Sequence, residues 1–162
     1  LPIWARLLPR LALAAALAAA AALGGVAAWQ YDAARDARQR AERAEARDAA
    51  LARVLAAPDA QASSGRLPDG ATGTVVVSRA ENRAAFFASG LAEPPPGRVY
   101  QLWFDDGGTM RPAGLLDPAQ GDEAVLMEGP LGDAGGMGVT VEPAGGSPQP
   151  TTEPLALMRF PA

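Results

Sequence analysis

The hydrophobic and polar positions divide the sequence into an apolar stretch, a charged stretch and a region of short alternating runs. The apolar stretch runs from Leu11 to Trp29, nineteen residues of Ala, Leu, Gly and Val closed by the Trp, and no charge follows before Asp32. A helix of this length rises about 28 Å, close to the ~30 Å hydrocarbon core of a bilayer. The pattern predicts a transmembrane helix over residues 11–31, after a flank at 1–10.

Two other interpretations of the apolar stretch stay open. Eleven of its nineteen residues are Ala, which inserts into a bilayer less favourably than Leu, Ile, Phe or Val. It could be a cleaved signal peptide, although its length exceeds the usual apolar run of about 7 to 15 residues, or a buried helix. Arg6 and Arg10 favour a cytoplasmic N-terminus by the positive-inside rule. We therefore expect a single-pass cell-membrane protein with an extracytoplasmic C-terminal domain.

The charged stretch, residues 32–57, is mostly Ala, Arg, Glu and Asp and contains no Gly or Pro. These are strong helix formers, and Pro58 is a stop signal, so we predict a charged helical stalk. Ala-rich heptad positions allow two interpretations, a solvated stalk or a homodimer through the stalk, and Asp48 interrupts the heptad seam. Residues 58–73, rich in Ser, Gly, Pro and Asp, are predicted to be a protease-accessible linker.

Short β-branched and aromatic runs separated by Gly and Pro clusters fill the rest of the chain, residues 74–162. Turn signals at this spacing are typical of an all-β sandwich rather than of βαβ units. We predict an extracytoplasmic antiparallel β-sandwich of about seven strands. The predicted strands are 74–79, 83–89, 98–104, 110–116, 123–128, 138–142 and 154–160.

The most apolar of these strands is Val99–Phe104. Tyr100, Leu102 and Phe104 share one face, and Trp103 lies on the other. Apolar residues on both faces are typical of a central strand that is covered on both sides. We expect these four residues to form the core strand, and the pattern alone leaves open which face points inward.

The amino-acid composition excludes several kinds of binding and catalytic site. The net charge is −4, and the chain contains no Cys and no His. The charge argues against nucleic-acid binding, which needs a clustered basic face. The missing residue types exclude thiol nucleophiles, Ser-His-Asp triads, Cys/His zinc sites and disulfides. The acidic residues show no calcium-loop spacing. We predict no catalytic residue, no metal and no cofactor, and hence no enzyme.

The stretch from Gly138 to Pro154 leaves a strand and continues through Pro- and Gly-rich backbone to the last strand. Its Ser and Thr hydroxyls can satisfy their own backbone, so a stiff loop is expected. The loop could serve structural packing, or it could form a ledge that binds a partner. The candidate ledge residues are Glu142, Gly145, Gly146, Ser147, Thr151 and Thr152.

Four strings resemble a known family. V-Y-Q-L-W-F (99–104), R-P-A-G-L-L (111–116), G-V-T-V-E-P-A-G-G-S-P-Q-P-T-T (138–152) and V-L-A-A-P-D-A (54–60) resemble the C-terminal domain of the anti-sigma-K factor (RskA-like) family of actinobacteria.

This resemblance implies a membrane-anchored anti-sigma factor that regulates transcription by holding an extracytoplasmic-function sigma factor. The present chain would be its transmembrane and extracytoplasmic sensor or gating part. The sigma factor would be bound by an upstream domain, expected before Leu1, and released by regulated intramembrane proteolysis after a site-1 cut. Gly24 and Gly25 would then either loosen the helix for the intramembrane protease or allow close helix packing.

A second function also fits the residues. A surface-anchored β-sandwich that binds a ligand or a protein would need no link to transcription, because sandwich scaffolds host many binding functions.

Overall fold

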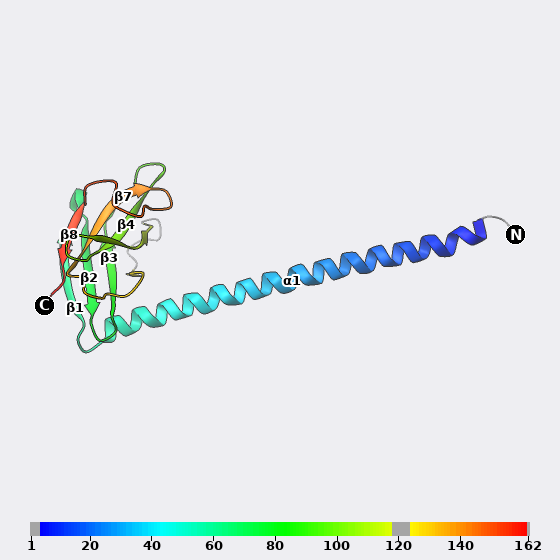
Figure 1. The fold of residues 1–162 in the computed structure, drawn as a ribbon, viewed down its shortest axis with the longest axis horizontal. Helices are drawn as coiled ribbons and strands as arrows, with labels where there is room; N and C mark the ends of the chain where they lie inside the picture. Colours follow the sequence, from blue (N-terminus) through cyan, green and yellow to red (C-terminus); the bar gives the residue numbers. More distant parts are fainter. Residues whose placement is uncertain (1–3, 118–123, 162) are drawn as a thin grey trace. The chain divides into compact units, whose positions relative to one another are not determined.

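The computed structural model describes residues 4–117 and 124–161. In these residues the chain forms one helix, α1 (Trp4–Ala56), a short 3₁₀ helix, η1 (Pro68–Gly70), and eight β-strands (Figure 1). The chain separates into two compact units, residues 1–46 and residues 47–162. The second unit therefore contains the last ten residues of α1 together with every strand. We call residues 57–161 the β domain.

α1 is a helix of 53 residues. Ala, Leu, Arg and Glu dominate its sequence, and each has a high helix propensity. The helix ends two residues before Pro58, which has no backbone N–H to continue the hydrogen-bond ladder. Self-association of its charged part, residues 32–56, stays a prediction.

The predicted fold class needs a correction at this helix. Among the residues that the structure describes, no helix combines the length and the apolar character needed to cross a membrane. The transmembrane helix predicted over residues 11–31 was therefore wrong. The stretch is mostly Ala, whose methyl group carries little apolar surface, and it continues without a break into Arg and carboxylate side chains.

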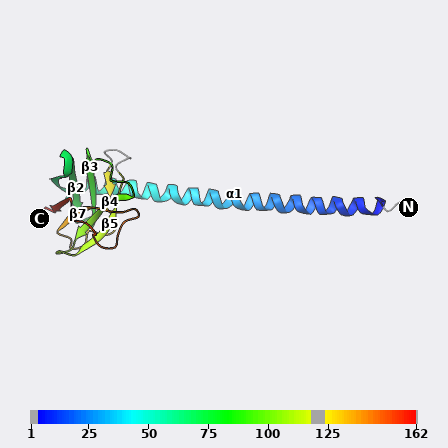
Figure 2. The ribbon, with the colours of Figure 1, turned by 90° about the horizontal axis from the view of Figure 1, so that it is seen from above.

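The strands form two antiparallel sheets of four strands each (Figures 1 and 2). The first has the order β1-β2-β3-β6 and comprises β1 (Gln61–Arg66), β2 (Thr72–Ser78), β3 (Arg83–Ser89) and β6 (Ala124–Leu126). The second has the order β5-β4-β7-β8 and comprises β4 (Arg98–Asp105), β5 (Met110–Leu116), β7 (Gly136–Pro143) and β8 (Ala156–Arg159).

The two sheets enclose one hydrophobic core. Val75 and Phe86 enter it from the first sheet, and Leu102, Phe104 and Val139 enter it from the second, all with no exposed surface. In the view of Figure 2, β2 and β3 lie above β4, β5 and β7. The antiparallel β-sandwich part of the prediction agrees with this arrangement, with eight strands instead of about seven.

The additional strand is β1, which lies inside the expected linker at 58–73. Its sequence, QASSGR, has no apolar alternation, so nothing in its pattern signals a strand. It is ordered by six paired positions along β2, from Gln61 opposite Val77 to Arg66 opposite Thr72. The linker prediction therefore needs correction over these residues, because partners distant in sequence supply the order.

Candidate functional site

One face of β4 belongs to the sandwich core and the other faces away from it. Tyr100, Leu102 and Phe104 are buried in the core, which settles the question that the sequence pattern left open. The Tyr100 hydroxyl donates to the carbonyl of Ala92 at 3.0 Å. Burial, together with the negative charge of Asp69, raises the pKa of Tyr100.

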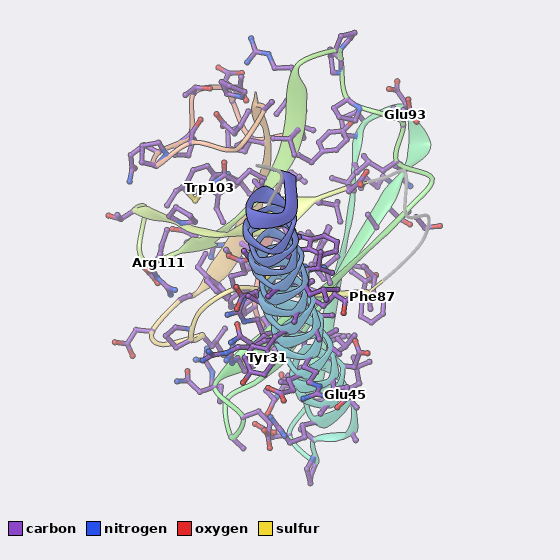
Figure 3. All side chains as sticks on the ribbon, turned by 90° about the vertical axis from the view of Figure 1, so that its right-hand side faces the viewer. Tyr31, Glu45, Phe87, Glu93, Trp103 and Arg111 are labelled. Carbon is purple, nitrogen blue, oxygen red and sulfur yellow. The ribbon has the colours of Figure 1, made fainter. Side chains whose placement is uncertain are left out.

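Trp103 lies on the opposite face and is nevertheless completely buried. In Figure 3, Trp103 and Arg111 of the second sheet lie on one side of the domain and Phe87 of the first sheet lies on the other. Next to Trp103 on the same face are Gln101 and, across the strand pair, Thr140. The connection from β7 to β8, residues 144–155, bonds to this face and forms an additional layer outside the sheet, which we call the β7–β8 loop.

The central group beneath the β7–β8 loop is the Glu142 carboxylate, which has no exposed surface. It accepts hydrogen bonds from the hydroxyls of Thr140 at 2.6 Å, Ser147 at 2.9 Å and Thr151, and from the Thr151 backbone N–H at 3.0 Å. The indole N–H of Trp103 donates to the Thr140 hydroxyl oxygen at 2.8 Å. A buried relay thus runs from the indole through a hydroxyl to the carboxylate.

These contacts decide the ionisation of Glu142. Burial by itself raises the pKa of the carboxyl, but the hydrogen bonds from Thr140, Thr151 and Ser147 outweigh it and lower the pKa from 4.5 to about 2. Hydrogen bonds to the charged form stabilise that form. Glu142 is therefore a permanent anion at neutral pH, and its chemistry is to hold the loop, not to exchange protons.

The first turn of the β7–β8 loop is also held by the side-chain amide of Gln101. The Gln101 side chain donates to the Ser147 carbonyl at 2.9 Å and accepts from the Ser147 N–H at 2.7 Å. Gly146 has a φ of 81°, and a Cβ there would lie 2.9 Å from the Gln101 amide oxygen and 3.0 Å from a Leu115 methyl. Gly is therefore needed both for the backbone conformation and for the close approach.

The structure brings the predicted ledge residues together in an unexpected way. Glu142, Ser147 and Thr151 point inward and fasten the loop, whereas the Thr152 hydroxyl donates to the Val141 carbonyl at 3.0 Å from an exposed position. Gly145 lies at the edge of the hollow described next. A partner-binding role for the six residues stays a prediction. Gln101 was not predicted as a functional residue; it is the one amide in the apolar strand β4, and that polar interruption was the available signal.

A hollow of about 590 Å³ separates the loop from the edge strand β5. Its loop wall is formed by residues 145–148, and its other wall by Pro112, Gly114, Leu115 and Glu128. Leu115 also lines a second hollow of about 370 Å³ with Glu93, Pro94, Arg98, Val99, Leu116 and Asp117.

The start of the β domain has its own polar anchor. The Asp59 carboxylate accepts from the Ala80 N–H at 2.9 Å and from the Ser78 hydroxyl at 2.7 Å. These hydrogen bonds lower the pKa of Asp59. Five residues earlier, Val54 near the end of α1 is completely buried. The junction between α1 and β1 is therefore fastened to the end of β2.

The two other predicted positions lie elsewhere. Gly24 and Gly25 are in α1, within the first compact unit, and a Cβ at either would meet nothing within 4 Å. Their predicted role in cleavage or packing stays a prediction. Among the described residues, no group of three or more carboxylates is placed to hold a metal ion.

Comparison with known proteins identifies the family of this architecture. Residues 11–155 match the family model described as "Anti-sigma-K factor rskA, C-terminal". The chain belongs to this family. The resemblance noted in the strings of residues 54–60, 99–104, 111–116 and 138–152 is thereby confirmed.

Relatives of the RskA C-terminal family cover different shares of the chain. A Streptomyces griseus protein named "Uncharacterized protein in phr 5'region" is 61% identical over 93% of this chain and 63% of its own length. "Anti-sigma-K factor RskA" of Mycolicibacterium vanbaalenii is 42% identical over 64% of the chain, and that of Mycobacterium tuberculosis 40% identical over 64%. The chain spans only 44% and 45% of these two proteins. No solved structure matches the chain.

Proposed function

We propose that the chain is the C-terminal, regulatory part of an anti-sigma factor. In this proposal the parent protein holds an extracytoplasmic-function sigma factor, and the β domain controls its release by proteolysis. Membership of the RskA C-terminal family supports the assignment, as do the relatives named anti-sigma-K factors. Because the chain spans less than half of those relatives, residues that bind the sigma factor would belong to the part of the parent protein outside this chain.

The observation that carries the proposal is the pairing of β1 directly after α1. Proteases bind their substrates as extended segments, so a strand that is paired in a sheet is protected until it separates. β1 pairs along its whole length with β2. A cut between α1 and the core of the β domain therefore requires that β1 first leaves the sheet.

β1 also contributes no side chain to the hydrophobic core. None of residues 61–66 belongs to the hydrophobic core, whereas Leu67, which follows directly, is 95% buried and does. The strand is held by main-chain pairing, by a 2.8 Å hydrogen bond between the Ser64 and Thr74 hydroxyls, by the Asp59 anchor, and by the close approach of Gly65 to the Met158 side chain of β8. Segments with few buried apolar contacts open locally far more easily than the core unfolds.

A reversible lock tests this mechanism. Ser64→Cys and Thr74→Cys together place a disulfide across the β1–β2 pair, and the chain contains no other Cys. With the disulfide closed, tryptic cleavage after Arg66 should slow by about tenfold or more, because β1 opening is blocked. Cleavage after Arg43 in α1 is the internal control. Reduction should restore the original rate.

The same pair of substitutions tests the regulatory role in cells. In the full-length parent protein, the locked pair should hold sigma-dependent transcription low under conditions that normally release it, and each single Cys variant should behave like the original protein. A locked protein whose reporter responds normally would contradict control through β1. Equal cleavage after Arg66 in the locked and the reduced chain would contradict the protection itself.

A binding module unrelated to transcription is the second candidate, and the hollow beside the β7–β8 loop favours it. Deleting residues 61–162 from the parent protein discriminates between the two functions. A changed sigma-dependent reporter supports regulation, and an unchanged reporter supports the binding module.

A further inference from the structure

We propose that the groove formed by the two hollows on either side of Leu115 is a binding site for an extended peptide with basic side chains. This inference goes beyond the proposed anti-sigma role. It rests on the shape of the groove, on one unpaired carboxylate and on the charge of the β domain.

An irregularity in β5 creates the groove. The register with β4 passes from Gln101 opposite Leu115 to Trp103 opposite Pro112, so β5 contains one additional residue. Gly114, with a φ of 115°, lies in this bulge. Bulges at sheet edges bend the strand and redirect its neighbours, and they occur often beside binding sites.

The bulge also positions Glu128. The Glu128 backbone N–H donates to the carbonyl of Ala113 at 2.8 Å. A Cβ at Gly114 would lie 3.4 Å from the Glu128 Cγ, so the Glu128 side chain lies directly against the glycine. The carboxylate is thereby placed in the wall of the larger hollow.

Glu128 has no counter-charge within the described part of the chain. No hydrogen bond or ion pair of its carboxylate occurs there, and the side chain is exposed. The guanidinium that precedes the bulge on β5, Arg111, is occupied by the Asp106 carboxylate at 2.8 Å and by the Pro130 carbonyl at 3.0 Å. An incoming cation would therefore meet an unneutralised carboxylate.

The opposite wall is rigid before any ligand arrives. Ser147 is held by both the Gln101 amide and the Glu142 carboxylate. A preformed wall binds without an ordering cost, which raises affinity for a given contact area. Leu115, 44% exposed, forms the apolar ridge between the two hollows.

Charge decides which peptide fits. The β domain contains thirteen Asp and Glu residues against six Arg, a net charge of −7. The smaller hollow adds the Glu93 carboxylate to that of Glu128 in the larger one, with Arg98 as the basic residue. Acidic groups in both hollows and an apolar ridge between them match a peptide that carries basic side chains around an apolar one.

The probe is the peptide acetyl-Arg-Ser-Leu-Ser-Arg-amide, titrated into the ¹⁵N-labelled chain and followed by NMR. Amide shifts should concentrate in residues 114–116 and 145–147. Glu128→Gln should weaken binding about fivefold, the loss expected for one charged contact near the surface. Asp133→Asn is the matched control, because it removes one exposed negative charge outside the groove and should change affinity by less than about twofold.

Three results would overturn the proposal. One is equal binding of the acidic counterpart acetyl-Glu-Ser-Leu-Ser-Glu-amide. The second is an equal loss of affinity in Glu128→Gln and Asp133→Asn, which indicates unspecific attraction to an acidic surface. The third is a set of amide shifts outside the groove, or none at all.

Discussion

Replacing Glu142 by Gln keeps the size of the side chain and removes its charge. The carboxylate accepts from the hydroxyls of Thr140, Ser147 and Thr151 and from one backbone N–H. A Gln side chain offers one acceptor oxygen and one donor group. The hydroxyls can turn to accept from the new donor, but the Thr151 N–H has only the remaining oxygen as a partner. The substitution therefore weakens the whole cluster without creating a cavity.

The size of the effect follows from the pKa of Glu142, which lies at about 2 against an ordinary 4.5. One pKa unit corresponds to about 1.4 kcal/mol, so the ceiling is about 3.5 kcal/mol. Thr151, one of the donors, is exposed, and water therefore screens part of the interaction. We expect Glu142→Gln to lower the free energy of unfolding by about 2 kcal/mol at pH 7.

The effect should depend on pH in a defined direction. Because the folded state lowers the pKa of Glu142, the stabilisation is complete above the unfolded-state value near 4.5. It is lost as the pH falls through about 2, since only the unfolded state binds the proton in between. The original chain and the Glu142→Gln variant should therefore converge in stability toward pH 2.

Urea unfolding followed by Trp103 fluorescence measures these differences, in a background with Trp4→Phe and Trp29→Phe so that one indole reports. Glu153→Gln, at an exposed position of the same loop, is the matched control and should cost less than about 0.5 kcal/mol. Equal stability of the two Gln variants at pH 7 would refute a stabilising role of the Glu142 charge. A Glu142→Gln deficit that is unchanged at pH 2 would refute it as well.

Three further substitutions test other contacts. Gly136→Ala places a Cβ 2.6 Å from the Met158 carbonyl oxygen. It should lower the free energy of unfolding by about 2–4 kcal/mol in urea titrations. A loss below about 1 kcal/mol contradicts the close approach. Trp103→Phe removes the indole donor to Thr140 and should cost about 2–3 kcal/mol in urea unfolding followed by circular dichroism, since the fluorescent reporter is lost; a Phe variant as stable as the original chain argues against the relay. Asp59→Asn should lower the melting temperature at pH 7. The difference from the original chain should shrink as the pH falls below 3.8, because backbone and hydroxyl donors at the end of β2 hold the pKa of Asp59 low. A difference independent of pH excludes the carboxylate as the cause.

The local pattern of apolar and polar residues was sufficient to predict most of the strands. The predicted strands 83–89 and 110–116 coincide with β3 and β5, and 98–104 differs from β4 by one residue. Apolar alternation and turn residues are properties of neighbours in sequence, and they determine where a strand begins and ends. The strings that resembled the RskA C-terminal family were likewise local, and the family match confirmed them.

Hydropathy along the chain was a poorer guide at α1. It correctly marked a long helical stretch, because Ala favours helix strongly. It also predicted a membrane span over residues 11–31, which the described helix does not support. The absence of charge and a high helix propensity are separate properties, and an Ala-rich stretch possesses both without the apolar surface of Leu or Ile.

What the sequence determined by itself is the identity of most strands, the end of α1 before Pro58, the apolar content of β4 and the family. Only the tertiary structure decided that β4 buries Tyr100 in the sandwich and Trp103 beneath a loop, and that QASSGR is a strand. The physical reason is the distance in sequence between partners. Gln101 meets Ser147 across 46 residues, and a buried polar side chain takes its role from the donors that the fold brings to it.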